Sequence, residues 1–74
     1  MSDALNIMEE LALQIQRVTE VRGHYAALIG MPGVNPHFAL AMIDGALKRA
    51  TAANGSNDPG AVVRSVTELR EIKE

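Results

Sequence analysis

The chain has 74 residues, a formal net charge of −2 and no cysteine. At this length a single hydrophobic core is marginal, and without cysteine neither a disulfide nor a thiolate zinc site can reinforce it. The acidic balance also disfavours a nucleic-acid partner, because binding to a polyanion normally needs a basic face.

Residues 2–29 are the most informative segment, because they predict one long amphipathic helix. Mostly apolar side chains recur along it in a seven-residue repeat, in which Arg22 is the only charge. This repeat consists of Met1, Ala4, Met8, Leu11, Ile15, Val18, Arg22, Tyr25 and Ile29. Ser2 is a candidate N-cap, and Gly30 followed by Pro32 is a typical C-terminal stop.

A second helix is predicted over residues 36–53, because Asn35 can cap it while Pro36 takes its first position. Its apolar side collects Ala39, Leu40, Met42, Ile43, Ala46, Leu47, Ala50 and Ala53. Asp44 and Lys48 lie four residues apart on the other side and are expected to pair there. Phe38 at the edge of the apolar side, and Leu13 on the polar side of the first helix, are candidates for exposed apolar contacts.

Asp58 and Pro59 repeat the pattern of a cap followed by a proline, which predicts a third helix over residues 59–72. Its narrow apolar stripe consists of Val62, Val66, Leu69 and Ile72. With loops at 30–35 and 54–58, residues 1–74 predict a single all-α domain. Its long and short helices form an antiparallel hairpin against which the third helix packs.

The two helices of the hairpin differ in length, since about 28 residues span roughly 42 Å and about 18 span roughly 27 Å. The surplus of the first helix must be covered by the third helix folding back or by a second copy of the chain. We expect the second copy, giving a homodimer that completes the helical bundle. Its predicted interface contains Met8, Leu11, Ile15 and Val18.

No arrangement of residues indicates catalysis or a cofactor, so a non-enzymatic protein is expected. The two histidines are too few for a zinc site, which usually takes three or four protein ligands. Arg22 on the apolar repeat needs a partner or must extend its charge to solvent. Together with Arg22, the residues His24, Tyr25 and His37 near the second helix start form a candidate site for an anion or a protein partner.

Small size, wide apolar helix faces and the absence of catalytic groups favour a helical protein-binding module. We expect it to act as a regulator, inhibitor or adaptor of a larger macromolecule, a profile typical of proteins that bacteriophages and mobile elements encode. One alternative is a binder that holds a nucleotide or other small anion between helices, and a second is a structural subunit of a larger assembly. With no apolar run near the roughly 18 residues of a membrane span and no basic secretory start, we expect a cytoplasmic location without membrane contact.

Overall fold

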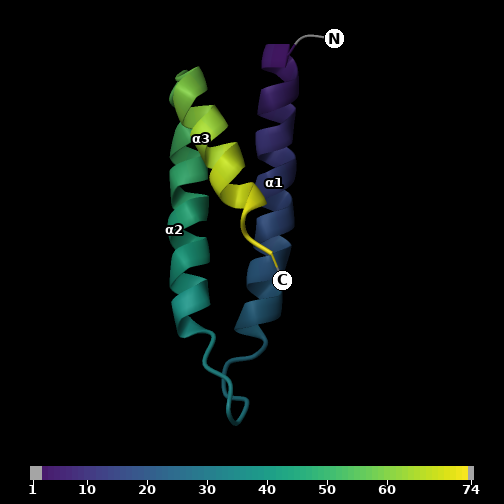
Figure 1. Cartoon of the computed structure of the whole chain (residues 1–74), viewed down its shortest axis with the longest axis vertical. Coiled ribbons are helices and arrows are strands. Elements are labelled where there is room, and N and C mark those ends of the chain that lie inside the picture. Colours follow the sequence, from purple (N-terminus) through teal and green to yellow (C-terminus); the bar gives the residue numbers. More distant parts are fainter. Residues whose placement is uncertain (1–2, 74) are drawn as a thin grey trace.

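The computed structural model describes the backbone of residues 3–73 and the side chains of residues 7–73. Over that range the chain forms three helices and no strand: α1 (Asp3–Ala26), α2 (His37–Asn54) and α3 (Pro59–Arg70). α1 and α2 form an antiparallel hairpin, and α3 turns back to lie across both (Figure 1). The predicted all-helical fold is confirmed. The molecule is elongated, with extents of 48 × 20 × 16 Å.

α3 begins at Pro59 as the sequence predicts, and α2 begins at His37, one residue later than predicted, with Pro36 at the cap position. Asn35 Oδ1 accepts a hydrogen bond of 3.2 Å from the backbone N–H of His37. Asp58 Oδ1 accepts one of 3.0 Å from the N–H of Gly60. In both places the proline occupies a position whose N–H would lack a helical partner. The candidate cap Ser2 and the preceding Met1 lie outside the described residues.

α1 and α3 end earlier than predicted, at Ala26 instead of residue 29 and at Arg70 instead of residue 72. Beyond these ends the N–H groups of Leu28 and Ile72 donate to the carbonyl three residues back, at 3.0 and 3.1 Å. Such bonds tighten the last turn and leave the helix unable to continue. Gly30 then adopts φ +88°, a backbone conformation that suits glycine and starts the loop.

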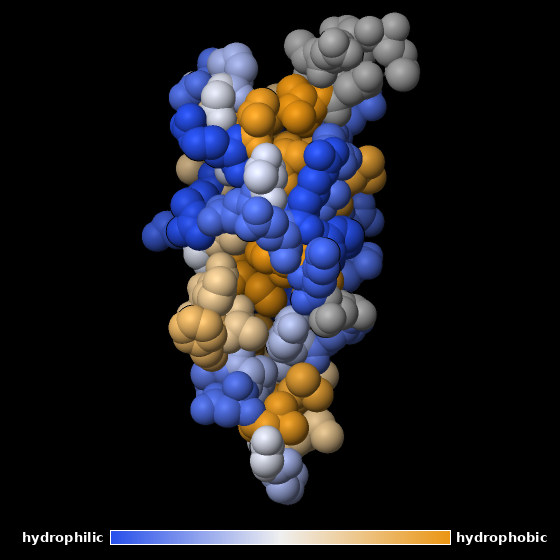
Figure 2. All heavy atoms as spheres, in the orientation of Figure 1, coloured by the Kyte–Doolittle hydropathy of each residue, from blue (hydrophilic) through white to orange (hydrophobic). Residues whose placement is uncertain are grey.

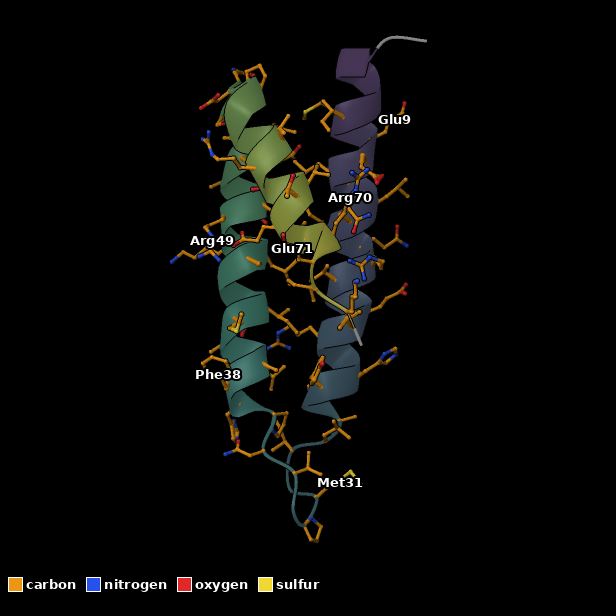
Figure 3. All side chains as sticks on the ribbon, viewed as in Figure 1. Glu9, Met31, Phe38, Arg49, Arg70 and Glu71 are labelled. Carbon is orange, nitrogen blue, oxygen red and sulfur yellow. The ribbon has the colours of Figure 1, made fainter. Side chains whose placement is uncertain are left out.

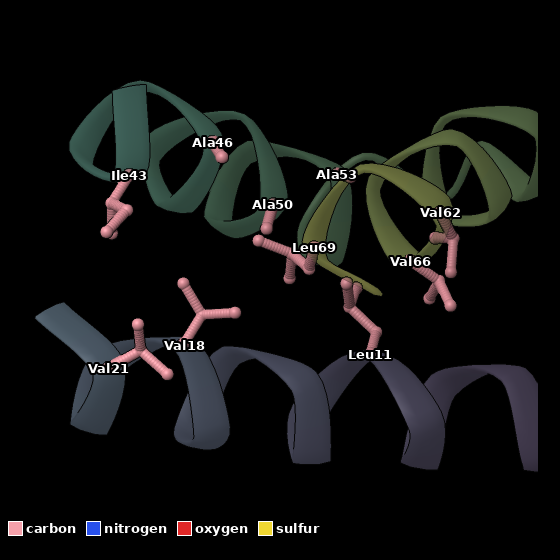
Figure 4. Close-up of a cluster of buried hydrophobic side chains, with 10 residues drawn as sticks. All are labelled: Leu11, Val18, Val21, Ile43, Ala46, Ala50, Ala53, Val62, Val66 and Leu69. Carbon is pink, nitrogen blue, oxygen red and sulfur yellow. The ribbon is translucent and has the colours of Figure 1, made fainter. Parts of the chain in front are cut away.

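The core lies where the three helices meet, and it is built from aliphatic side chains. Leu11, Val18 and Leu69 have no exposed surface, and Figure 4 shows Leu11 close to Leu69 and Val66. The buried cluster consists of Leu11, Val18, Val21, Ile43, Ala46, Ala50, Ala53, Val62, Val66 and Leu69. Because α2 contributes three alanines, the other helices can approach its backbone closely.

α3 supplies the cover that the unequal hairpin needs. Its buried stripe packs against both α1 and α2, so that Leu11 and Val18 are sealed inside one chain. The length mismatch of the hairpin therefore does not by itself require a second copy. Of the two ways of covering the first helix, the structure shows the third helix folding back.

Among the described residues, each pair of helices is joined by an ion pair. Arg22 on α1 pairs with Asp44 on α2, and Arg49 on α2 pairs with Glu68 on α3. Arg70 on α3 returns to Glu10 on α1 at 2.9 Å. All three are at the surface, where such pairs contribute little to stability, but together they favour one arrangement of the helices.

Leu69 tests whether α3 is integral to the core. We expect Leu69→Ala to lower the free energy of unfolding by about 2–5 kcal/mol, because it leaves a cavity in a fully buried site. Leu13→Ala is the matched control: Leu13 is 61% exposed, so its truncation should change stability by less than about 0.5 kcal/mol. Urea denaturation of both variants measures the difference, and equal losses would contradict the packing of α3.

Candidate functional site

The most exposed large apolar side chain among residues 7–73 is on α2. Phe38 is 78% exposed, and Met42, one turn further along the helix, is 58% exposed. Figure 2 shows an apolar area over the lower half of α2, where these residues lie. The exposure predicted for Phe38 is confirmed. The placement of Met42 on the buried side of the second helix is wrong.

Met42 is exposed because α3 is too short to reach it. α3 has 12 residues and α2 has 18, or about 18 Å against about 27 Å. Figure 1 shows that α3 ends against α1, at about the level of the middle of α2, so it does not reach the first turns of α2. On those turns Phe38 and Met42 are exposed, while Leu40 and Ile43 on the core side are buried.

A groove of about 460 Å³ runs between α2 and α3 at the opposite end of the same helix. We call it the α2–α3 groove. Small side chains form most of its surface, and charged ones stand at its edge. It is lined by Arg49, Ala52, Ala53, Ser56, Ala61, Arg64, Ser65 and Glu68.

Arg49 is held in a fixed position at the edge of this groove. Its Nε and Nη2 donate to the two carboxylate oxygens of Glu68, at 3.0 and 2.8 Å. The same carboxylate raises the pKa of Arg49 above its ordinary value, so the guanidinium stays charged. A two-bond pair of this kind fixes orientation as well as charge. Figure 3 shows Arg49 and Phe38 on the side of α2 that faces away from α1.

The α2 outer face, as we name it, combines these features on one side of the helix. It consists of Phe38, Ala41, Met42, Gly45, Lys48, Arg49 and Ala52. Gly45 and Ala52 were not predicted as site residues from the sequence, because neither has a charged or a large apolar side chain. The available signal is their spacing: Phe38, Gly45 and Ala52 recur every seven residues.

A second apolar area lies at the connection between α1 and α2. Ile29, Met31 and Val34 are each between 41% and 51% exposed. We call these three residues the loop surface. In Figure 2 hydrophilic residues separate the apolar area of α2 from the one near the loop. The apolar area of α2 and the loop surface are therefore distinct.

The four residues predicted to bind an anion or a partner do not converge. Arg22 is engaged by Asp44, with Nη2 3.3 Å from Oδ2 and its Nε on Oδ1. The expected pair of Asp44 with Lys48 is therefore replaced by one between helices. The Tyr25 hydroxyl donates to the Lys73 carbonyl at 3.4 Å.

The two histidines of that predicted site are both exposed. His24 is exposed on α1, two residues from Arg22 and so about 200° around the helix from it. His37 is exposed at the first turn of α2. His24 is thus on a different side of α1 from Arg22, and Arg22 and Tyr25 are bonded to other residues of the chain.

The predicted dimer interface is divided between core and surface. Leu11 and Val18 are fully buried within one chain, and Ile15 packs partly buried against the same cluster. Met8 alone of the four is exposed, at 38%. As the chain is folded here, a second copy can reach Met8 but not Leu11 or Val18.

The sequence matches no protein-family model and no curated protein, and the chain matches no solved structure. Function must therefore be argued from the surface alone. Among the described residues, no three histidine, aspartate or glutamate side chains gather as metal ligands. None of the helices in that part of the chain combines the length and the apolar character needed to cross a membrane.

The carboxylates in the ion pairs predict how the stability of the fold depends on pH. The side-chain hydrogen bond from Arg22 lowers the pKa of Asp44, and bonds from Arg70 and Gln14 lower that of Glu10. A carboxyl group with a lowered pKa in the folded state stabilises the fold above its ordinary pKa, and that contribution is lost as the pH falls toward the lowered value.

We therefore expect the free energy of unfolding to decrease below about pH 5, and Asp44→Asn to make this decrease smaller. Urea denaturation between about pH 7 and pH 3 measures both. Glu20→Gln, an exposed carboxylate of α1, serves as the control and should leave the profile as it is. An Asp44→Asn profile parallel to that of the wild type would show that this ion pair does not form.

Proposed function

We propose that this chain is a small non-enzymatic module that binds a helix of another protein chain through the α2 outer face. The observation that carries the proposal is the 78% exposure of Phe38 beside an exposed Met42. Covering a Phe side chain is worth about 1.5–3 kcal/mol, and aromatic residues dominate the energetics of interfaces. The α2–α3 groove supports the same function, because small side chains let a helix approach closely.

A helical partner is favoured over an extended one. An extended partner binds as an added strand and needs unpaired backbone N–H and C=O groups on the surface that it joins. In α2 these backbone groups are hydrogen-bonded within the helix. A helix laid along α2 would present apolar side chains three, four and seven residues apart, as α3 does toward α1 and α2. α3 thus shows which kind of helix this hairpin accommodates.

The loop surface supports a role as regulator or adaptor. Ile29, Met31 and Val34 are exposed in an area separate from that of α2, so two partners could be contacted at once. An adaptor needs two such areas. Self-association belongs to this proposal too, and it would use the α2 outer face, since one chain already buries Leu11 and Val18.

Selection from a library of short amphipathic helical peptides tests the binding function without a known partner. We expect enriched peptides to carry apolar residues at helical spacing. They should bind Phe38→Ser at least about tenfold more weakly than the wild type, because the lost burial of one Phe corresponds to that factor or more. Titration calorimetry of the enriched peptides measures this.

Leu13→Ser is the matched control, because Leu13 is also large, apolar and 61% exposed but lies on α1. It should retain full affinity for the selected peptides. If no peptide is enriched, or if the peptides bind Phe38→Ser as tightly as the wild type, the α2 outer face is not a binding surface.

A further inference from the structure

On the α2 outer face, the large residue Phe38 and the small residue Ala52 lie at equal distances on either side of Gly45. Phe38 lies seven residues before Gly45, and Ala52 lies seven residues after it. Seven residues are close to two helical turns, so Phe38 and Ala52 each lie within about 20° of Gly45 around the helix and about 10.5 Å from it along the axis. The large residue and the small one are therefore equidistant from a glycine at the centre.

Around Ala52 the structure forms a hole of the kind that receives a side chain from another helix. Arg49, Ala52, Ala53 and Ser56 stand at relative positions 0, 3, 4 and 7, and all four line the α2–α3 groove. Four residues in this arrangement form the hole of knobs-into-holes packing. Phe38, largely exposed, is the corresponding knob on the same helix.

We propose that the α2 outer face is occupied by a second copy of this chain, in an antiparallel pair whose two-fold axis passes Gly45. In such a pair Phe38 of each copy enters the α2–α3 groove of the other beside Ala52. This rests on the proposed function, because it names the partner for the same face. A two-fold interface needs one surface that is complementary to itself, and the knob and the hole on α2 meet that condition.

Gly45 suits the centre of this pair. It is the point where the two α2 helices would cross closest, and a glycine there adds no side chain between the backbones. A Cβ at Gly45 would meet only the guanidinium of Arg49, 3.3 Å away, which Glu68 holds in place. Space at the centre is thus limited by one side chain and not by backbone.

Charges across the pair are complementary as well. Along the common axis, Lys48 of one copy lies within about 3 Å of the level of Asp44 of the other, on the same side of the pair. This contact occurs twice by symmetry.

Light scattering behind a sizing column, over a range of protein concentration, tests the pair. We expect the wild type to form a dimer, and Phe38→Ser or Ala52→Glu to weaken self-association at least about tenfold. Both residues are exposed, so circular dichroism should show that the variants fold. Ala12→Glu, the same change at an exposed alanine of α1, is the control and should dimerise like the wild type.

Mixing the two variants tests the two-fold geometry. A mixed pair keeps one intact contact, the Phe38 of the Ala52→Glu copy in the unaltered groove of the Phe38→Ser copy, so the mixture should dimerise more strongly than either variant alone. Gly45→Cys should cross-link spontaneously to its own copy, since a disulfide needs Cα atoms within about 7 Å. The chain has no native cysteine to compete, and Ala12→Cys is the control.

If the wild type is a monomer at every protein concentration, a second copy is not the partner of the α2 outer face. The same conclusion holds if the wild type dimerises but neither Phe38→Ser nor Ala52→Glu weakens the dimer. Dimers without the Gly45→Cys cross-link overturn the axis at Gly45. The proposed function fails separately. Helical peptides that bind the monomer in a Phe38-dependent way would keep the α2 outer face as a binding surface for a different protein, whereas loss of both results would remove both proposals.

Discussion

The packing of α3 into the crevice between α1 and α2 is the interaction on which the rest of the molecule depends. Leu69 brings a fully buried side chain from α3 to Leu11 on α1, and Val66 seals the same layer. Arg17 reinforces the end of α3 by donating at 2.7 Å to the Leu69 carbonyl, which also accepts a bond from the N–H of Ile72. A chain of this size thus closes its core with its own C-terminal segment and, having no cysteine, without a disulfide.

The shortness of α3 decides what remains outside. With 12 residues it seals the part of the hairpin near Leu11 and leaves the first turns of α2 uncovered, which is why Phe38 and Met42 face solvent. Its position against α2 also creates the α2–α3 groove, two turns beyond Gly45. The same packing event therefore produces the closed core, the exposed aromatic residue and the small-residue hole on one helix. This common origin links the fold to the proposed binding face.

The sequence predicted what depends on local spacing. Asn35 and Asp58 indicated two helix starts because capping involves neighbours, and the spacing of Val62, Val66 and Leu69 indicated which side of α3 is buried. Contacts between distant segments were not accessible in this way. The spacing of residues around Leu11 does not indicate whether α3 or a second copy covers it. The sequence predicted an ion pair between Asp44 and Lys48, four residues apart on one helix, but folding brings Arg22, 22 residues away, to Asp44 instead. Met42 was misplaced for the same reason, since its exposure depends on where α3 stops.

The central claim is that one chain closes its own core through α3. Methyl nuclear Overhauser effects in a sample mixed from isotope-labelled and unlabelled chains test this most directly, because isotope filtering separates contacts within a chain from contacts between chains. We expect the contacts of Leu11 with Leu69 and Val66 to appear within the labelled chain and to be missing from the interchain spectrum at every concentration. If those contacts appear only between chains, α3 is packed on a second copy, and the account of both the core and the free face of α2 is contradicted.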